Sequence, residues 1–596
     1  MREDYQPLVQ NSPYGGQLLK EEIEGSVDGR LNPENNVDTV KGNDRSMYAY
    51  VPSTGVPHAK QAQVLFVLRN DASEESAVNL LETLKLKELA EDRHFILLFP
   101  NPAEEGWNYT SDPAKEDDGG FLVRCFAALK KTKHGCAGFN GMIFHLGTDP
   151  ESSAMVMTFA SEHPLDAAAV MAGSFPEGYV IPEGKHAEET AWIYDGNKAA
   201  LKHVLDGNGE SEEVEEDNVK EYRQKVNPCV RCFYSEEALT SDEVEKAWET
   251  MFSTARRWRN DVYGIYQPRV DYKAKGYIKH YEDSSLGVNN NFPHTWYEYV
   301  PEKVKESGEK APLLFYFHGI NCTPLYGPEQ SGLTDIADRD GIILVFPSPA
   351  IEERWNVWDD PRLPSDASFI TALVEHMKKT YAIDEKRIYV SGFSMGSMFT
   401  NAMACSYPEV FAGAMAFNGP HAGYLSVLDD SRKGMLMFNP KSMIKDLEPS
   451  DETVSVTHAR ADEKKNSYDY RMPFVQTVGL LDGVGFNPGK TWPITSMEDG
   501  SWLPGINYWK AYNNIPVEED CFDSTISGLK ADETVDNGRN HIQKWYTQDE
   551  GHLPLYQLQL SERMPHAIEY PEVETAWSWI KHFERNEDGS LTYTEE

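Results

Sequence analysis

Short apolar runs alternate with segments of helical periodicity along the second half of the chain. The runs lie at 313–317, 342–346, 387–391, 413–417, 474–480 and 555–560. Each has the length and composition of a buried strand. Between two of them, one helical face is marked by the spacing of Phe369, Ile370, Leu373, Val374 and Met377. Strands that alternate with helices predict an α/β fold, in which helices cover both faces of a mostly parallel sheet.

The first half of the chain repeats the pattern of the second. Three pairs of segments match in the same order, namely MYAYVP (47–52) with WYEYVP (296–301), FILLFPNPAEEGWN (95–108) with IILVFPSPAIEERWN (342–356), and DEVEKAW (242–248) with PEVETAW (571–577). A ladder of matches in a constant order indicates duplication of a whole structural unit. We therefore expect two tandem α/β domains, covering residues 1–270 and 271–596.

A nucleophile motif follows one of the predicted strands. The strand at 387–391 runs into Gly392-Phe393-Ser394-Met395-Gly396, and a helical segment follows. G-x-S-x-G between a strand and a helix is the nucleophile elbow of α/β-hydrolases, where small residues leave room for a sharp turn. This context predicts Ser394 as a nucleophile and the backbone amide of Met395 as an oxyanion donor.

A second oxyanion donor is expected from the loop after the strand at 313–317. That loop reads His318-Gly319-Ile320-Asn321, and the amide of Ile320 or of Asn321 has the required place. His318 itself is interpreted as a residue that packs the loop.

The acid and the base of a triad are expected at later strand ends, in the order Ser, Asp, His. Asp482 follows the strand at 474–480, and His566 follows the strand at 555–560. His566 is therefore predicted to be the base, with Asp482 orienting its ring. His421, which also follows a strand, is predicted to line the pocket and stays open as an alternative base.

The motifs together resemble those of the esterase and polyhydroxybutyrate depolymerase family, which is related to feruloyl and acetylxylan esterases. The resemblance rests on RWNVWDDP, the elbow and its helix, GLLDG and MPHA, and it covers most of 290–585. It implies a carboxylic-ester hydrolase without a cofactor or a metal, with Trp355 and Trp358 near the site. Aromatic loops suit polyhydroxyalkanoate-type, feruloyl or other phenolic, and acetyl-sugar esters.

The first copy lacks the same chemistry at the aligned positions. Asp149 or Pro150 stands where the second copy has Ser394, and Glu237 stands in place of His566. The acid alone is retained, as Asp195. We therefore expect the first domain to be catalytically inactive.

The strong acidity of the chain excludes some partners. A net charge of −40 argues against nucleic acids and anionic membranes, because both attract basic surfaces. The acid-rich stretch 206–221 is predicted to be a solvated loop or a disordered insertion. Seven cysteines give no disulfide framework, and the lone C-x-x-C of Cys229 and Cys232 has no second pair that would complete a zinc site.

The sequence leaves several points open. No apolar run approaches the roughly eighteen residues of a membrane span, and the first residues do not read as a signal peptide. These features predict a cytoplasmic protein, or a secreted one if a leader has been removed. The predicted partner is a small-molecule or oligomeric ester, and the oligomeric state is unknown. A peptidase or thioesterase on the same scaffold, or a non-catalytic binding protein, are the alternatives.

Overall fold

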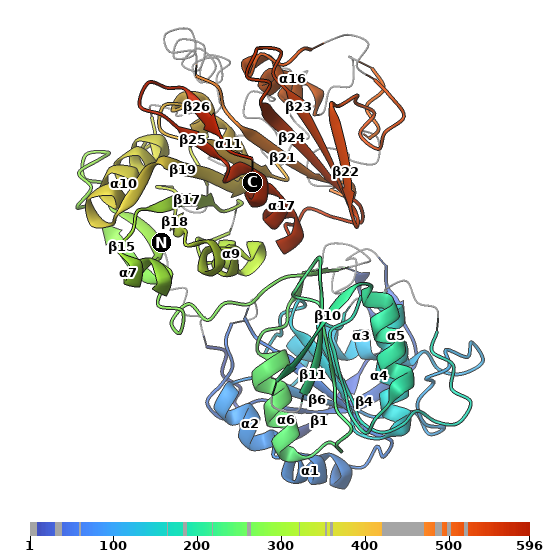
Figure 1. The fold of residues 1–596 in the computed structure, drawn as a ribbon. Coiled ribbons are helices and arrows are strands. Elements are labelled where there is room, and N and C mark those ends of the chain that lie inside the picture. The colour runs from blue at the N-terminus through green and yellow to red at the C-terminus, as the bar shows by residue number, and fades with distance from the viewer. Residues whose placement is uncertain are drawn as a thin grey trace. The chain divides into compact units, whose positions relative to one another are not determined.

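The chain forms two compact units in the computed structural model, Arg2–Arg269 and Val270–Glu596, called here the first unit and the second unit. In Figure 1 the first unit runs from blue to green and the second from light green to red. The structure describes residues 9–29, 38–58, 61–163, 165–182, 188–216, 219–258, 264–320, 322–351, 354–357, 362–419, 470–482, 492–496, 502–517 and 522–595. Each unit is described by itself.

The second unit is built on a sheet of ten strands among its described residues (Figure 1). The strand order is β15 (Ile278–Asp283), β16 (His294–Tyr299), β18 (Ile343–Pro347), β17 (Ala311–Phe317), β19 (Ile383–Phe393), β20 (Gly413–Phe417), β21 (Phe474–Gly479), β24 (Pro554–Ser561), β23 (Asn540–Tyr546) and β22 (Glu533–Asn537). The six strands from β18 to β24 are parallel, and the outer pairs are antiparallel.

The first unit has the same sheet, strand for strand. Its order is β1 (Leu18–Ile23), β4 (Arg45–Tyr50), β6 (Ile96–Pro100), β5 (Val64–Leu68), β7 (Ile143–Gly147), β8 (Ala168–Met171), β9 (Ala191–Ile193), β12 (Arg231–Tyr234), β11 (Val219–Gln224) and β10 (Ser211–Glu216). The strands from β6 to β12 are parallel. Two mostly parallel sheets with one strand order confirm the predicted fold class, a tandem pair of α/β-hydrolase domains.

The helices lie between these strands in the chain. In the first unit they are α1 (Glu74–Thr83), α2 (Leu86–Arg93), α3 (Asp118–Ala128), α4 (Pro150–Glu162), α5 (Lys198–Asn208), α6 (Ser241–Ala247) and two short turns, Leu129–Lys131 and Trp248–Phe252. In the second unit they are α7 (Glu302–Ser307), α8 (Tyr326–Ser331), α9 (Leu333–Asp340), α10 (Asp366–Thr380), α11 (Met395–Ser406), α16 (Leu503–Tyr512) and α17 (Tyr570–Ile580). The apolar stripe predicted from residue 369 to residue 377 lies on α10 and is buried.

Three short two-stranded sheets complete the described secondary structure. They are formed by β2 (Ser26–Val27) with β3 (Val40–Lys41), β13 (Arg257–Trp258) with β14 (Ile265–Tyr266), and β25 (Phe583–Arg585) with β26 (Leu591–Tyr593). No helix in the described part of the chain is both long and apolar enough to span a bilayer.

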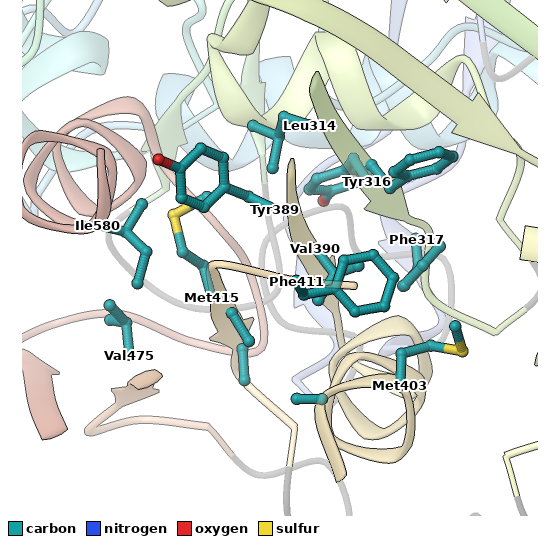
Figure 2. Close-up of a cluster of buried hydrophobic side chains, with 14 of the residues drawn as sticks. Leu314, Tyr316, Phe317, Tyr389, Val390, Met403, Phe411, Met415, Val475 and Ile580 are labelled. Carbon is teal, nitrogen blue, oxygen red and sulfur yellow. The ribbon is translucent and has the colours of Figure 1, made fainter. Parts of the chain in front are cut away.

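The core of the second unit packs around its central strands β17, β19, β20 and β21. Figure 2 shows side chains from β17, β19, β20 and β21 in one buried cluster with Met403 of α11 and Ile580 of α17. Gly413 lets α17 come close to β20, because a Cβ at this position would lie 2.6 Å from the Ile580 side chain. α11 packs against β19 and β20, and α17 packs against β20 and β21.

The acid-rich segment differs from its prediction. Instead of a solvated loop, Ser211–Glu216 and Val219–Gln224 form the antiparallel strands β10 and β11. Val219 is buried, whereas Glu212, Glu213 and Glu215 are exposed on the edge strand. Charged side chains on an edge strand stay hydrated and oppose pairing with another chain. The acids are therefore compatible with a strand that composition alone does not predict.

Candidate active site

Ser394 lies in a sharp turn between β19 and α11. Its backbone has φ 58° and ψ −118°, a conformation that side-chain-bearing residues rarely adopt. The Ser394 N–H donates to the carbonyl of Phe417, at the end of β20, over 2.9 Å. The residue is 3% exposed. This backbone turn places a buried hydroxyl at the carboxyl ends of the central strands.

Glycines on both sides of Ser394 make the turn possible. A Cβ at Gly392 would lie 2.4 Å from the carbonyl oxygen of Gly396, and one at Gly396 would lie 2.0 Å from the carbonyl oxygen of Phe317. Both distances are shorter than real contacts of a Cβ atom. The motif therefore requires glycine at these positions because the elbow, β17 and the start of α11 are too close for a side chain.

The structure brings the three predicted triad residues into one hydrogen-bonded chain. His566 Nε2 lies 2.8 Å from Ser394 Oγ, and His566 Nδ1 lies 2.7 Å from Asp482 Oδ2. When Nδ1 carries the proton and donates to Asp482, Nε2 is free to accept from the serine hydroxyl. Asp482 is 1% exposed, so its carboxylate is shielded from water beside the imidazole. This arrangement can remove a proton from Ser394.

The predicted oxyanion loop lies against the serine. A Cβ at Gly319 would be 3.2 Å from the Cβ of Ser394, so the backbone that leads to Ile320 passes next to the nucleophile. His318 is buried, its ring nitrogen Nδ1 lies 2.8 Å from the carbonyl of Gly319, and burial lowers its pKa to about 4. Met395 is the first residue of α11, where a helix leaves its N–H groups without intrahelical partners. Both backbone segments thus lie beside Ser394.

Trp355 holds the loop after β17 through a hydrogen bond. Its indole N–H donates to the carbonyl of His318 over 2.8 Å, and its ring stacks on Phe399 at 4.7 Å. The side chain is only 2% exposed. The structure therefore places Trp355 in the core, where it fixes the loop.

The first unit has the same bond at the equivalent place. Trp107 donates to the carbonyl of Arg69 over 2.9 Å. Since the tryptophan is retained in the copy that lacks the serine, its bond to the loop belongs to the fold. Of the other predicted site residues, Asn321, Trp358 and His421 lie outside the described residues.

At the elbow position the first unit has an ordinary helix cap. Asp149 precedes α4 with φ −151° and ψ 171°, which is extended backbone. Its carboxylate accepts from the N–H of Ser152 over 3.0 Å and from the side chain of Asn70 over 2.8 Å. The strained turn of Ser394 is absent at Asp149, and the carboxylate is used to cap α4.

The other two aligned residues of the first unit are also placed differently from a triad. The Asp195 carboxylate accepts from the N–H of Gly173 over 2.7 Å. Glu237 is exposed, and its backbone carbonyl accepts from the N–H of Asp195 over 2.9 Å. In these described positions the carboxylates of Asp149 and Asp195 accept backbone N–H groups, and Glu237 is exposed.

The loop that carries His566 is fastened by residues that sequence reasoning missed. Arg539, in the turn between β22 and β23, donates to the Glu562 carbonyl over 3.0 Å and pairs with the buried carboxylate of Glu569. Its own carbonyl accepts from the N–H of Glu562 over 2.9 Å. Both ends of the segment around His566 are thereby tied to one arginine. No local motif marks Arg539, because the contacts depend on how a hairpin folds back.

A fully buried carboxyl lies directly after this loop. Glu572, in the first turn of α17, has its Oε1 3.4 Å from the Asn418 side-chain amide. Burial raises the pKa of Glu572 from 4.5 to about 8, a hydrogen bond with Thr477 opposes the shift, and the charge of Glu569 adds to it. The base loop therefore rests on a carboxyl that is mostly neutral at neutral pH.

The part of the chain that the structure describes contains no cluster of side chains suited to bind a metal ion. No group of three or more histidine, cysteine or acidic side chains is placed to hold an ion there. Cys232 is buried in β12, and Cys229 is half-buried.

Comparisons with known proteins point to esterases and to peptidases. The sequence model of the prolyl oligopeptidase family matches residues 366–482. The chain is 35% identical over 128 residues to feruloyl esterase B of Neurospora crassa, a match that covers 21% of this chain and 43% of that protein. It is 32% identical over 130 residues to poly(3-hydroxyalkanoate) depolymerase C of Paucimonas lemoignei, which covers 21% of this chain and 30% of that protein.

The chain thus spans less than half the length of these curated relatives. Their names agree with the resemblance predicted from the motifs and confirm it. Among solved structures, the acetyl xylan esterase from Aspergillus awamori overlays 51% of this chain on 98% of its own, with 17% identity and a TM-score of 0.34. The fold assignment itself rests on the strand order of the two sheets.

Removing the buried acid should change how stability depends on pH. Because the pKa of Glu572 is raised in the folded chain, its neutral form favours folding; this contribution is complete below about pH 4.5 and is lost as the pH rises through about 8. Glu572→Gln should therefore lose less stability than the wild type between about pH 5 and about pH 9, as measured by urea midpoints. Glu574→Gln, on the same helix, is the control. Parallel pH curves for Glu572→Gln and the wild type would contradict the prediction.

The two equivalent tryptophans allow a matched test of the loop support. Trp355→Phe and Trp107→Phe each remove one buried indole bond, and each should reduce local stability by about 1–3 kcal/mol. Hydrogen exchange of peptides from each unit measures this loss. Only Trp355→Phe should also slow the reaction of Ser394 with a fluorophosphonate, because only that loop lies beside a serine. Equal labelling rates in both variants would refute a link between Trp355 and the site.

Proposed function

We propose that the second unit is a serine hydrolase of carboxylic esters that works through an acyl-enzyme. The observation that carries the proposal is the hydrogen-bonded chain from Ser394 through His566 to Asp482, set at a strained turn between strand and helix. A hydroxyl that donates to an imidazole, which in turn donates to a buried carboxylate, is the arrangement that activates serine for acyl transfer.

The mechanism follows from the position of each group. His566 takes the proton as Ser394 Oγ attacks the ester carbonyl, while Asp482 stabilises the imidazolium and fixes its orientation. The amides of Met395 and Ile320 stabilise the oxyanion. His566 then gives the proton to the leaving alcohol, and the same residues activate water to release the acid.

The substrate class is proposed from the relatives and from charge. The matched relatives are named as a feruloyl esterase and a poly(3-hydroxyalkanoate) depolymerase, and we propose phenolic, acetyl-sugar or hydroxyalkanoate esters for this chain. A net charge of −40 disfavours polyanionic substrates. Leu481, adjacent to Asp482, is 44% exposed and offers an apolar surface beside the triad.

A peptidase is the second candidate, because the prolyl oligopeptidase model matches the segment that contains Ser394 and Asp482. p-Nitrophenyl acetate and butyrate, feruloyl and acetylated-sugar esters, and hydroxybutyrate oligomers form the ester panel. Matched p-nitroanilides test amide cleavage. Turnover of esters with little turnover of anilides supports the esterase, and the reverse supports the peptidase.

Removal of each triad residue should have graded effects. Ser394→Ala and His566→Ala should each lower kcat by about 10⁶-fold, and Asp482→Ala should lower it by about 10⁴-fold, because the base remains without its orienting partner. Steady-state hydrolysis of p-nitrophenyl butyrate, recorded after any initial burst, measures the loss of kcat. A Ser394→Ala protein with a rate within about tenfold of the wild type would remove the nucleophile assignment.

The first unit is proposed to be inactive. Asp149→Ala should leave kcat for ester hydrolysis unchanged, while the loss of the helix cap destabilises α4 by about 1 kcal/mol. The decisive protein is full-length Ser394→Ala. If it still hydrolyses an ester and the further change Asp149→Ala removes that rate, the first unit is an enzyme.

A further inference from the structure

Asn418 joins the segment of the acid to the segment of the base. It is the first residue after β20 and is fully buried. Its side-chain Oδ1 accepts from the N–H of Gly479 over 2.5 Å, and its Nδ2 donates to the carbonyl of Ala567 over 2.7 Å. Gly479 ends the strand that leads to Asp482, and Ala567 follows His566. One amide thus connects the two supports of the His566–Asp482 pair.

The orientation of this amide is determined by its partners. Gly479 presents only a donor to it and Ala567 only an acceptor, so the oxygen and the nitrogen cannot be exchanged. The backbone is held as well, because the N–H of Asn418 donates to the carbonyl of Thr477 over 3.1 Å. Asn418 therefore sets the spacing between β20, β21 and the base loop with both its backbone and its side chain.

In the first unit a glycine occupies the position that corresponds to Asn418. Gly392 pairs with Ala416 and Gly147 pairs with Met171, so Asn418 corresponds to Gly173, two residues after Met171. Both residues have positive φ, 47° for Asn418 and 83° for Gly173. Glycine is the residue that fits this conformation most readily, and asparagine is among the few others that adopt it.

The acid takes a different partner in each unit. In the first unit the Asp195 carboxylate accepts from the N–H of Gly173 itself. In the second unit the carboxylate of Asp482, which the sequence alignment matches to Asp195, lies 2.7 Å from His566 Nδ1, and the side chain of Asn418 accepts from the N–H of Gly479. Asparagine thus stands in the unit that has Ser394 and His566, and glycine stands in the unit whose aligned residues are Asp149 and Glu237.

We propose that Asn418 is a positioning residue that holds His566 and Asp482 in register by bridging Ala567 and Gly479. The proposal rests on the proposed function of Ser394. Proton transfer requires the imidazole to keep its distance to Ser394 Oγ, and a small displacement of a catalytic group has a large effect on rate. The residue acts through the two segments that it connects and does not touch the reacting atoms.

The test is Asn418→Gly in the full-length protein. Glycine suits the positive φ, as Gly173 demonstrates, so the backbone is not strained by the change. With p-nitrophenyl acetate, we expect kcat to fall about tenfold to hundredfold while KM stays within about twofold. Labelling of Ser394 by a fluorophosphonate should slow by a similar factor.

The matched control is Asn513→Gly. Asn513 is also fully buried, and its side chain accepts from the N–H of Met472 over 2.8 Å and donates to the carbonyls of Met472 over 2.7 Å and of Leu555 over 3.4 Å. The bonds to Met472 lie before the start of β21, at the end away from Asp482. Asn513→Gly should lower stability as much as Asn418→Gly while leaving kcat near that of the wild type.

A second readout separates positioning from general loosening. In an Asp482→Ala background, Asn418→Gly should cause little further loss of kcat, because the pair it aligns is already broken.

If Asn418→Gly does not fold, Asn418→Asp, which keeps the acceptor for Gly479, takes its place and should show the same rate loss. Equal kcat for the Asn418 and Asn513 variants, or additive losses with Asp482→Ala, would overturn the proposal. A wild-type protein that neither hydrolyses the ester nor labels would overturn the proposed function and this inference with it.

Discussion

The strained backbone of Ser394 is the constraint on which the site depends. A side-chain-bearing residue in a sparsely populated conformation costs about 1–3 kcal/mol and persists only where its surroundings over-determine it. Here the surroundings are the end of β20, which binds the Ser394 N–H, and two glycines that allow β17 and α11 to approach. The hydroxyl therefore has one position, and the other groups are arranged around it.

Much of this arrangement could be predicted from sequence because its signals are local or ordered. The elbow motif identifies Ser394 from five consecutive residues, and the alternation of strands and helices gives the sheet. Asp482 and His566 follow from chain order, because parallel strands bring their carboxyl ends to one edge. The matching segments of the two halves predict the duplicated fold, and both sheets have the same strand order.

The residues that could not be predicted make contacts across long stretches of chain. Arg539 contacts the base loop only because β22 and β23 fold back beside β24, and Asn418 reaches Gly479 and Ala567 at separations of 61 and 149 residues. Buried polar side chains leave no periodic signal. Composition also gave a wrong prediction for β10 and β11, which form a hairpin instead of a loop. The edge of a sheet tolerates charged side chains that would be excluded from its centre.

The duplication separates what the fold requires from what the chemistry requires. Trp107 and Trp355 make the same bond in both units, so that bond serves the sheet and its loop. The elbow does not persist in the same way, since Asp149 has extended backbone and Ser394 does not. A strained turn without a nucleophile has a cost and no use, and a capping aspartate removes it. The relaxed turn of the first unit thus accompanies Glu237 at the position aligned with His566, and the strained turn is found where the imidazole of His566 lies beside the serine.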